Sequence, residues 1–397
     1  MPSGELIFDD AQRDDARPSR YNEPTFTFLN RSAGEAWQRV RDLVEDWFRH
    51  VPAAARPDLR SRLRSTTGND FRSAFFELYC IETLLRSDWT IELHPTLGHT
   101  SRRPDLRAQR GNESFFLEAT TTATPRHEAS AESRVNAVID DINDRLEIGS
   151  FMLGIDVISI GANAPSTRRL CDELRSWLDG LDPDALREAA RGGGDETHEW
   201  AFDAWSLVFK AFPLAADKRG PGGRIVGTIM PAEASFVDDI TPLRRRVTDK
   251  AKAYGDLDTG FVVAVGAISS FSGDGDIASA LYGSSAVQYY VNPAPGAPPP
   301  AAIRLNDGLI AGPNGWRRTE VSALVTTTML TPWTIATTVP TWWTNSGADH
   351  ALSLPAPLLR EAHLDRETRT IAYVDAASPP HEYFGLVEGW PGFTRVS

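Results

Sequence analysis

Residues 104–121 read PDLRAQRGNESFFLEATT, and this stretch decides the fold. Apolar and polar residues alternate through much of residues 104–110 and 114–121, the period of a β-strand with one buried face. Gly111-Asn112 between the two runs is a pair that suits a two-residue hairpin turn with positive φ at both central positions. The stretch therefore predicts a hairpin with Gly111 and Asn112 as its turn.

The register of this hairpin places two acidic side chains opposite each other. If the loop has two residues, Arg110 pairs with Glu113, and counting back from the turn pairs Asp105 with Glu118. Directly paired side chains share a sheet face at a separation of about 5 Å. Two carboxylates so close repel each other unless a cation lies between them, and oxygen ligands suit Mg²⁺ or Mn²⁺. The pattern predicts a divalent-cation site.

A helix and a short strand come before the hairpin. Residues 71–86 carry apolar side chains at helical spacing, and Asn69 or Asp70 can cap them. Residues 89–93 alternate like a strand. Glu77 lies on the apolar side of the helix, so we expect it to point toward the sheet.

The order of these elements resembles the PD-(D/E)XK nuclease superfamily, whose core has the order αβββαβ. The motif matches Pro104-Asp105 and the triplet 118–120, Glu-Ala-Thr, while Glu77 matches the helix acid that many members add. The resemblance implies a restriction-endonuclease-like α/β fold, with a mixed central sheet flanked by helices. It also implies Asp105, Glu118 and Glu77 as ligands of Mg²⁺ or Mn²⁺.

Each acid also has a simpler interpretation. Glu77 can be a structural acid paired with Arg72 or another base, Asp105 can be a residue at the start of a strand, and Glu118 can be a charge that protects a strand edge from aggregation.

The lysine of the superfamily motif is missing, because position 120 is Thr120. A cation is needed there to orient the attacking water and to stabilise charge on the phosphate. Residues 242–254 predict a helix, and Lys250 lies at the edge of its apolar stripe, whereas Lys252 points away from it. We expect Lys250 to replace the motif lysine within about 8 Å of Glu118.

Two arginines are candidates for binding the substrate. Arg107 alternates onto the face of Asp105, where it suits a phosphate group. Arg246 lies in the predicted helix 242–254, whose basic residues can equally form a solvated face.

The closing helix and strand of the core can be assigned in two ways. The first assignment uses the helix 242–254 and the apolar strand 261–265, with a large insertion at about 126–239. The second uses the helix 130–148 and the strand 151–160 instead, and the sequence does not decide between them.

The domain limits follow from this core. We expect an N-terminal arm and helical region at residues 1–65, with residues 1–24 peripheral and a helix capped by Ser32 and Glu35. Residues 66–270 form the nuclease-like core with its insertion. Residues 271–397, rich in Gly, Ser and Pro at their start, form a loop-rich C-terminal extension packed on the core.

Composition sets limits on the function. The chain has 397 residues, of which 41% are hydrophobic and 24% charged, and its net charge is −13. A negative chain repels polyanions, so contact with nucleic acid needs a local basic patch. Two cysteines are too few for a disulfide framework, and Cys80 and Cys171 are interpreted as buried thiols. No export signal or membrane-length apolar run is found, so we expect a cytoplasmic protein without a membrane partner.

The function that these observations favour is a Mg²⁺-dependent DNA endonuclease, which the resemblance links to bacterial defence or DNA processing. One alternative is an inactive relative that binds nucleic acid or acts as a scaffold. Another is an enzyme or interaction protein of a different fold in which the acids are dispersed. Assembly as a homodimer, or with partner subunits of a larger system, stays open.

Overall fold

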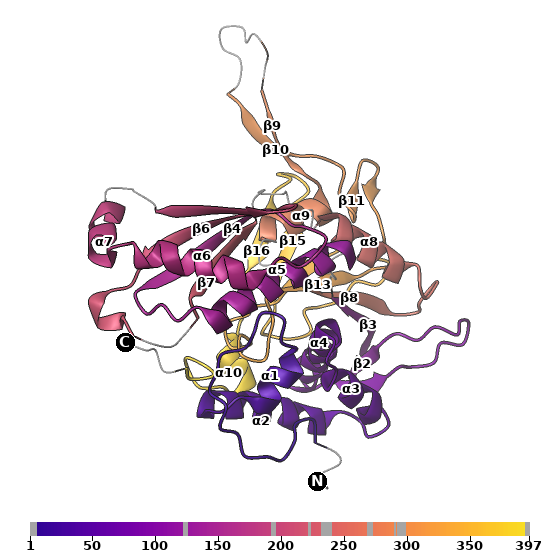
Figure 1. Ribbon diagram of the computed structural model, residues 1–397. Coiled ribbons are helices and arrows are strands. Elements are labelled where there is room, and N and C mark those ends of the chain that lie inside the picture. The colour runs from indigo at the N-terminus through magenta and orange to yellow at the C-terminus, as the bar shows by residue number, and fades with distance from the viewer. Residues whose placement is uncertain are drawn as a thin grey trace. The chain divides into compact units, whose positions relative to one another are not determined.

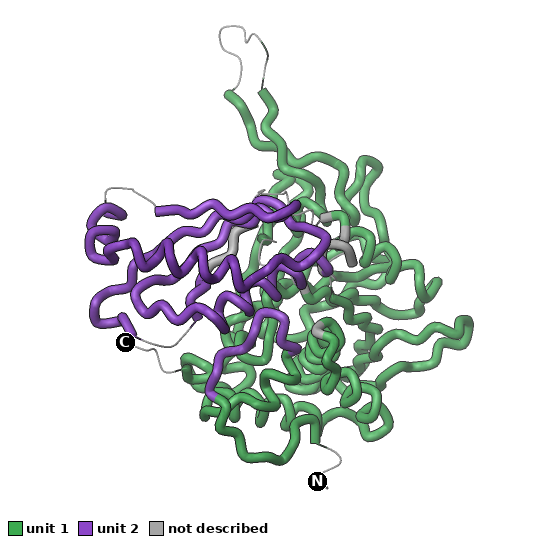
Figure 2. Tube along the Cα trace, viewed as in Figure 1, with its two compact units in different colours: residues 1–15, 25–123, 238–397 green, residues 16–24, 124–237 purple. Residues whose placement is uncertain are grey.

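The computed structural model describes residues 6–121, 126–191, 196–220, 224–231, 240–267, 273–289, 291 and 299–393. The chain is mixed α/β and divides into two compact units, shown in green and purple in Figure 2. Unit 1 comprises residues 1–15, 25–123 and 238–397, and unit 2 comprises residues 16–24 and 124–237. Across the described segments, no helix is long and apolar enough to span a membrane.

An eight-stranded mixed sheet organises the described part of unit 1, in the order β1-β2-β3-β8-β13-β14-β15-β16 (Figure 1). The pairs β3/β8, β8/β13 and β14/β15 are parallel, and the other neighbours are antiparallel. The strands are β1 (Thr90–Leu93), β2 (Leu106–Arg110), β3 (Glu113–Thr121), β8 (Gly260–Ala267), β13 (Ala323–Thr328), β14 (Thr341–Thr344), β15 (Arg360–Leu364) and β16 (Ile371–Val374).

The C-terminal region is more than the predicted loop-rich extension, because it supplies β13 to β16 of this sheet. The tryptophans of β14 explain why. Trp342 and Trp343 are adjacent, so they point to opposite faces of the sheet, and each is buried in a different apolar cluster. Such side chains belong to the core of a sheet and not to its periphery.

Helices cover both faces of the sheet. One apolar cluster joins Leu106, Leu117 and their neighbours to the N-terminal helices, and the other joins Phe116 and Phe261 to the later helices. The helices of the first face are α1 (Thr25–Arg31), α2 (Glu35–His50), α3 (Arg56–Leu63), α4 (Gly68–Leu85) and α10 (Pro380–Phe384), and those of the second are α8 (Ile240–Ala251) and α9 (Asp274–Tyr282).

Two small hairpins complete the described part of unit 1. The strands β9 (Ser285–Gln288) and β10 (Ala301–Arg304) pair with each other and extend away from the large sheet, as Figure 1 shows. The strands β11 (Ala311–Gly312) and β12 (Gly315–Trp316) form the second hairpin.

The hairpin of β2 and β3 has the predicted register. Leu106 pairs with Leu117, and Arg110 pairs with Glu113. The turn itself differs in detail, because Gly111 has a positive φ of 58° whereas Asn112 is not among the residues with positive φ. Positive φ at the first central position alone is the pattern of a type II′ turn, which also suits the twist of a hairpin.

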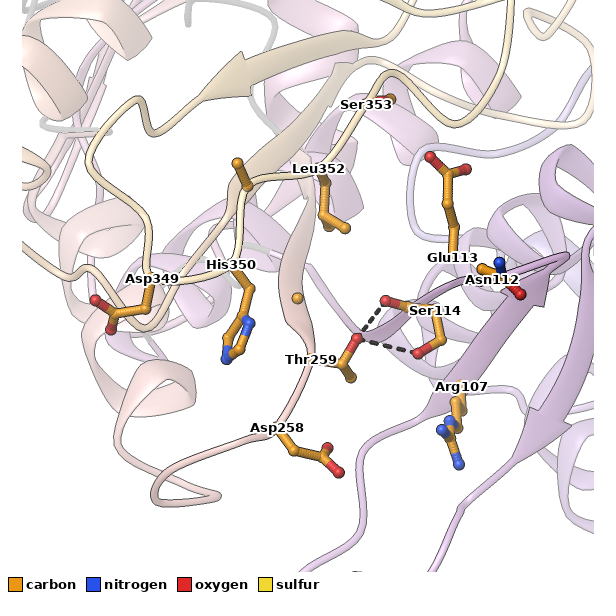
Figure 3. A pocket seen from close by; sticks show the side chains of 12 residues that line it. Arg107, Asn112, Glu113, Ser114, Asp258, Thr259, Asp349, His350, Leu352 and Ser353 are labelled. Atoms are coloured by element: carbon orange, nitrogen blue, oxygen red, sulfur yellow. Dashed lines mark hydrogen bonds between the residues drawn. The ribbon is translucent and has the colours of Figure 1, made fainter.

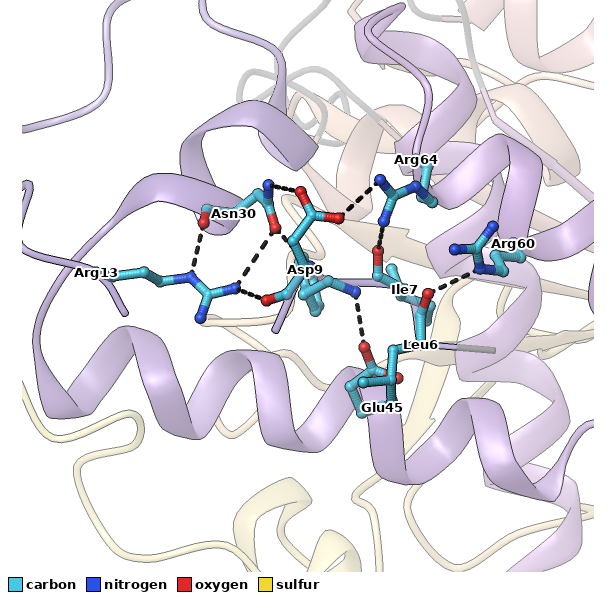
Figure 4. A network of polar contacts seen from close by, with 9 residues as sticks. Leu6, Ile7, Asp9, Arg13, Asn30, Glu45, Arg60 and Arg64 are labelled. Atoms are coloured by element: carbon cyan, nitrogen blue, oxygen red, sulfur yellow. Dashed lines mark hydrogen bonds and ion pairs between the residues drawn. The ribbon is translucent and has the colours of Figure 1, made fainter. Parts of the chain in front are cut away.

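The start of the chain is not the peripheral arm that the sequence predicts. Ile7 and Phe8 are buried in the core of unit 1. Figure 4 shows the polar contacts that hold this segment: the Phe8 N–H donates to Glu45 (2.8 Å), and Arg64 donates to the Ile7 carbonyl (2.5 Å) and to Asp9 (2.9 Å). Backbone groups of an irregular segment need such partners when they are buried.

The predicted capping box at Ser32 and Glu35 is wrong. The Ser32 hydroxyl donates to the Phe28 carbonyl (2.6 Å) at the end of α1, and Gly34 occupies the N-cap position of α2 without a side-chain hydrogen bond. The hydroxyl group bonds to the preceding helix because α1 ends at Arg31, directly before Ser32.

Unit 2 has its own sheet and its own core. Over the described residues the strand order is β5-β6-β4-β7, and one apolar cluster joins the sheet to the unit's helices. The elements are α5 (Arg126–Arg145), β4 (Phe151–Ser159), α6 (Thr167–Asp179), α7 (Pro183–Arg191), β5 (Thr197–Phe202), β6 (Trp205–Pro213), the 3₁₀ turn η1 (Ala216–Lys218) and β7 (Val226–Pro231). The strand that pairs with β3 is β8, so the assignment of α5 and β4 as the closing pair is wrong.

Candidate functional site

Glu118 is the buried acid at the centre of the candidate site. Side chains of β3 alternate, so Phe116 and Glu118 face α8, whereas Phe115 and Leu117 face α4. Only 3% of Glu118 is exposed. A buried carboxylate needs a charged or hydrogen-bonding partner, because burial removes its hydration.

Lys250 provides the first partner of Glu118. Val247 and Ala251 anchor α8 on the sheet, and Lys250 stands beside this stripe with its side chain 30% exposed. Its ammonium group donates a hydrogen bond to Oε1 of Glu118. Lys252 is exposed, so the structure separates the two lysines in the way that the helical pattern predicts.

Tyr254 provides the second partner, which the sequence pattern did not single out. The residue follows the end of α8, and its hydroxyl group donates to Oε2 of Glu118. Both oxygens of Glu118 therefore have a donor. From the sequence Tyr254 is part of an apolar stripe, and its position four residues after Lys250 is the only signal that a hydroxyl could reach the same acid.

Asp105 lies just before β2, beside Glu118. Its Oδ2 accepts a hydrogen bond from the Ala119 N–H (2.8 Å), which ties it to the neighbouring strand. Burial raises the pKa of Asp105 to about 7, and the negative charges of Glu118 and Glu77 contribute in the same direction. The Ala119 N–H and the Lys250 charge oppose this rise.

Glu77 has a different environment from the one predicted. It is buried on α4, which packs on the face of the sheet opposite to Glu118, and Arg62 of α3 donates to its Oε2 (2.6 Å). Arg62 also donates to Asp58 (2.9 Å). These contacts agree with the simpler interpretation of Glu77 as a structural acid paired with a base, and the base is Arg62 and not Arg72. Within the described ranges, no three His, Cys, Asp or Glu side chains are grouped so that they could hold a metal ion.

The two predicted substrate-binding arginines lie in different surroundings. The Arg107 guanidinium lies 5.6 Å from the centre of the Phe116 ring, and its buried Nε has no hydrogen-bond partner. Arg246 is exposed on α8. Arg107 also lines a cavity of about 590 Å³ at the end of the sheet where β3 and β8 begin, shown in Figure 3.

This cavity does not contain the acids. Ser114, Thr259 and His350 line it together with Arg107, whereas Asp105, Glu118 and Lys250 do not. The Thr259 hydroxyl and Ser114 are hydrogen-bonded to each other, as Figure 3 shows. Of the predicted site residues, Arg107 alone reaches it. Glu118 is a buried acid with two side-chain donors next to a second acid of raised pKa, and we place the candidate chemistry there.

Asp105 and Glu118 fit a divalent cation by their chemistry. Both side chains offer carboxylate oxygens, and the pKa of Asp105 is raised mainly by burial and then by the negative charge of Glu118, which a bound cation would offset. Mg²⁺ is commonly held by one or two carboxylates, with waters and substrate phosphate completing its shell. Two acids therefore suffice, although the third predicted ligand, Glu77, is engaged by Arg62.

Comparison of the chain with protein-family models, with curated proteins and with solved structures finds no match. The geometry of the site and the order of the elements therefore carry the functional argument.

Proposed function

We propose that this protein is a divalent-metal-dependent phosphodiesterase that cleaves DNA. The observation that carries the proposal is the hydrogen bond between the Lys250 ammonium group and Glu118, beside Asp105. A partly buried cation next to two carboxylates provides the two kinds of charge that phosphodiester hydrolysis requires, one to bind a metal and one to stabilise the phosphate.

The order of elements supports the proposal. The segments α4, β1, β2, β3, α8 and β8 follow the order helix, three strands, helix, strand, and β8 adds to the sheet parallel to β3. The same order is found in the core of the PD-(D/E)XK nucleases, which the chain resembles. We infer that residues 124–237 are an insertion between the third strand and the closing helix of such a core.

Each residue of the site has one role in this proposal. Asp105 and Glu118 bind Mg²⁺ or Mn²⁺, which supplies Lewis-acid activation of water and phosphate when bound. Lys250 replaces the lysine that Thr120 cannot provide, and it stabilises negative charge on the phosphate. Glu77 contributes negative charge beside Asp105 and is not a third ligand, because Arg62 holds it.

The test of this proposal uses two lysines of the same helical region. With Mn²⁺ and duplex DNA, cleavage should fall by at least about a hundredfold in Lys250→Ala, since the charge that stabilises the phosphate is lost. Lys252→Ala removes the same charge from the protein but leaves Glu118 untouched, and its rate should stay within about threefold of the wild type.

Equal rates for the two variants would contradict the role of Lys250. A wild-type protein that binds DNA without cleaving it would favour the alternative, a binding protein or scaffold with the same fold. Two observations favour this alternative: position 120 is a threonine, and both oxygens of Glu118 are engaged by protein donors.

A further inference from the structure

Tyr254 contacts both segments that carry the acids of the site. Its hydroxyl group is hydrogen-bonded to Glu118 on β3 and lies 3.3 Å from the carbonyl oxygen of Arg103. Arg103 comes two residues before Asp105. The backbone of Tyr254 is also tied to this loop, since His99 Nε2 donates to the Tyr254 carbonyl (2.6 Å).

The hydroxyl group of Tyr254 has two acceptors and only one hydrogen. A charged carboxylate is the stronger acceptor, so the bond to Glu118 is preferred while no cation is present. When a cation withdraws charge from Glu118, the Arg103 carbonyl is a second acceptor within reach. A buried hydroxyl group without a partner is destabilising, and this second acceptor avoids that cost.

We propose that Tyr254 is a positioning residue for the metal site. It orients Glu118 and holds the loop before Asp105, so that the two carboxylates keep one relative position when a cation binds. The residue is not itself a ligand or a catalytic group. This inference rests on the proposed function, because it presumes that Asp105 and Glu118 bind a divalent cation.

Tyr282 is a matched control in the same unit. It is fully buried, and its hydroxyl group also donates to backbone carbonyl oxygens, those of Thr344 (2.9 Å) and Ala362 (3.2 Å). Replacement by Phe removes one buried hydroxyl group in either case. Only Tyr254→Phe removes a contact with Glu118.

In the experiment the full chain is titrated with Mn²⁺ alone. The melting temperature is measured at each Mn²⁺ concentration and compared with the metal-free value of the same protein. The Mn²⁺ concentration that gives half of the maximal rise should increase about tenfold in Tyr254→Phe, since loss of a residue that orients a ligand commonly weakens metal binding by 10–100-fold. Tyr282→Phe should titrate like the wild type, and Asp105→Asn should show no rise.

A second readout separates positioning from general destabilisation. At saturating Mn²⁺ the DNA KM of Tyr254→Phe should stay at the wild-type value, whereas the Mn²⁺ dependence of the rate shifts about tenfold, as in the melting experiment. A general loss of structure would instead lower the metal-free melting temperature and weaken both Phe variants equally.

The outcomes distinguish this inference from the proposed function. If Mn²⁺ stabilises the wild type but not Asp105→Asn, and Tyr254→Phe titrates like the wild type, the positioning role is wrong and the metal site stands. Equal weakening of Tyr254→Phe and Tyr282→Phe also overturns the positioning role. If the wild type shows no rise that depends on Asp105, the proposed metal site is wrong, and the assignment of Tyr254 is wrong with it.

Discussion

At the scale of single residues, the charges around Glu118 determine the properties of the site. Lys250 and Tyr254 satisfy both oxygens of this carboxylate, whereas Asp105 accepts a hydrogen bond from the Ala119 N–H alone within the described part of the chain. The negative charge is therefore least compensated at Asp105. Its pKa is raised mainly by burial, so the folded protein holds a proton on this side chain more tightly than the unfolded chain does.

This preference gives a prediction about pH and stability. The pKa of Asp105 is about 7 in the folded protein and near 3.8 in the unfolded chain, so the folded state binds the proton more tightly. Stability from this group is therefore complete at low pH and is lost as the pH rises toward 7. In Asp105→Asn that loss is absent, and the variant should gain on the order of 4 kcal/mol relative to the wild type between pH 4 and pH 8.

Urea unfolding at a series of pH values, with a metal chelator present, measures this difference. Parallel stability profiles for the wild type and Asp105→Asn would show that Asp105 titrates normally and that the two carboxylates do not influence each other. Added Mg²⁺ should oppose the loss at pH 8 in the wild type alone, because a cation favours the ionised form.

At the scale of elements, the hairpin of β2 and β3 determines which acids meet. Its register pairs Leu106 with Leu117, so the next residues along the two chains are Asp105 and Glu118, and Asp105 accepts a hydrogen bond from the Ala119 N–H. A shift by one residue would turn Glu118 toward α4 and away from Lys250. The turn that sets the register has Gly111 with φ 58°, a backbone conformation that L-residues with a Cβ adopt at a cost.

The turn can be tested with one methyl group. Gly111→Ala should lower the free energy of unfolding by about 1 kcal/mol, since the added Cβ is strained although the space around it is open. Gly98→Ala is the control: its surroundings are equally open and its φ is not positive, so the change should stay within about 0.5 kcal/mol. Urea midpoints of the two variants give the comparison, and equal midpoints would contradict the role of φ at Gly111.

At the scale of the whole molecule, the chain builds two units by passing between them more than once. Residues 16–24 belong to unit 2 although they lie between segments of unit 1. Asp140 of α5 explains their place, because its buried carboxylate accepts hydrogen bonds from the backbone N–H groups of Tyr21 (2.7 Å) and Asn22 (3.1 Å).

Removal of that carboxylate should affect unit 2 alone. Asp140→Ala leaves two backbone donors without their acceptor and should lower stability by about 2 kcal/mol. Amide hydrogen exchange should become faster in residues 16–24 and in β4 and β6, while β8 and β13 keep their protection. Asp144→Ala removes an exposed partner of Arg20 and should cost less than about 1 kcal/mol. Faster exchange throughout both units would contradict the independence of their cores.

Several features of the site could be predicted because their cause is local. The pairing of β2 with β3 follows from a two-residue turn, and the orientation of Lys250 relative to Lys252 follows from the period of a helix. The turn and the helical period each involve only a few neighbouring residues, so the sequence alone can reveal them. The predicted residue ranges accordingly agree within a few residues with those of α4, β1, β2, β3 and α8.

The partners of these residues depended on the tertiary structure. Arg62 is bound to Glu77, Tyr254 reaches Glu118, Ile7 enters the core, and the C-terminal region adds strands β13 to β16 to the sheet. Each of these contacts joins segments that no short period connects. The sequence by itself determined the hairpin and the directions of Glu118 and Lys250, since side-chain direction follows from local backbone geometry. Only the tertiary structure decided which buried charge is paired with which donor, because burial of a charge is compensated by whatever distant segment packs against it.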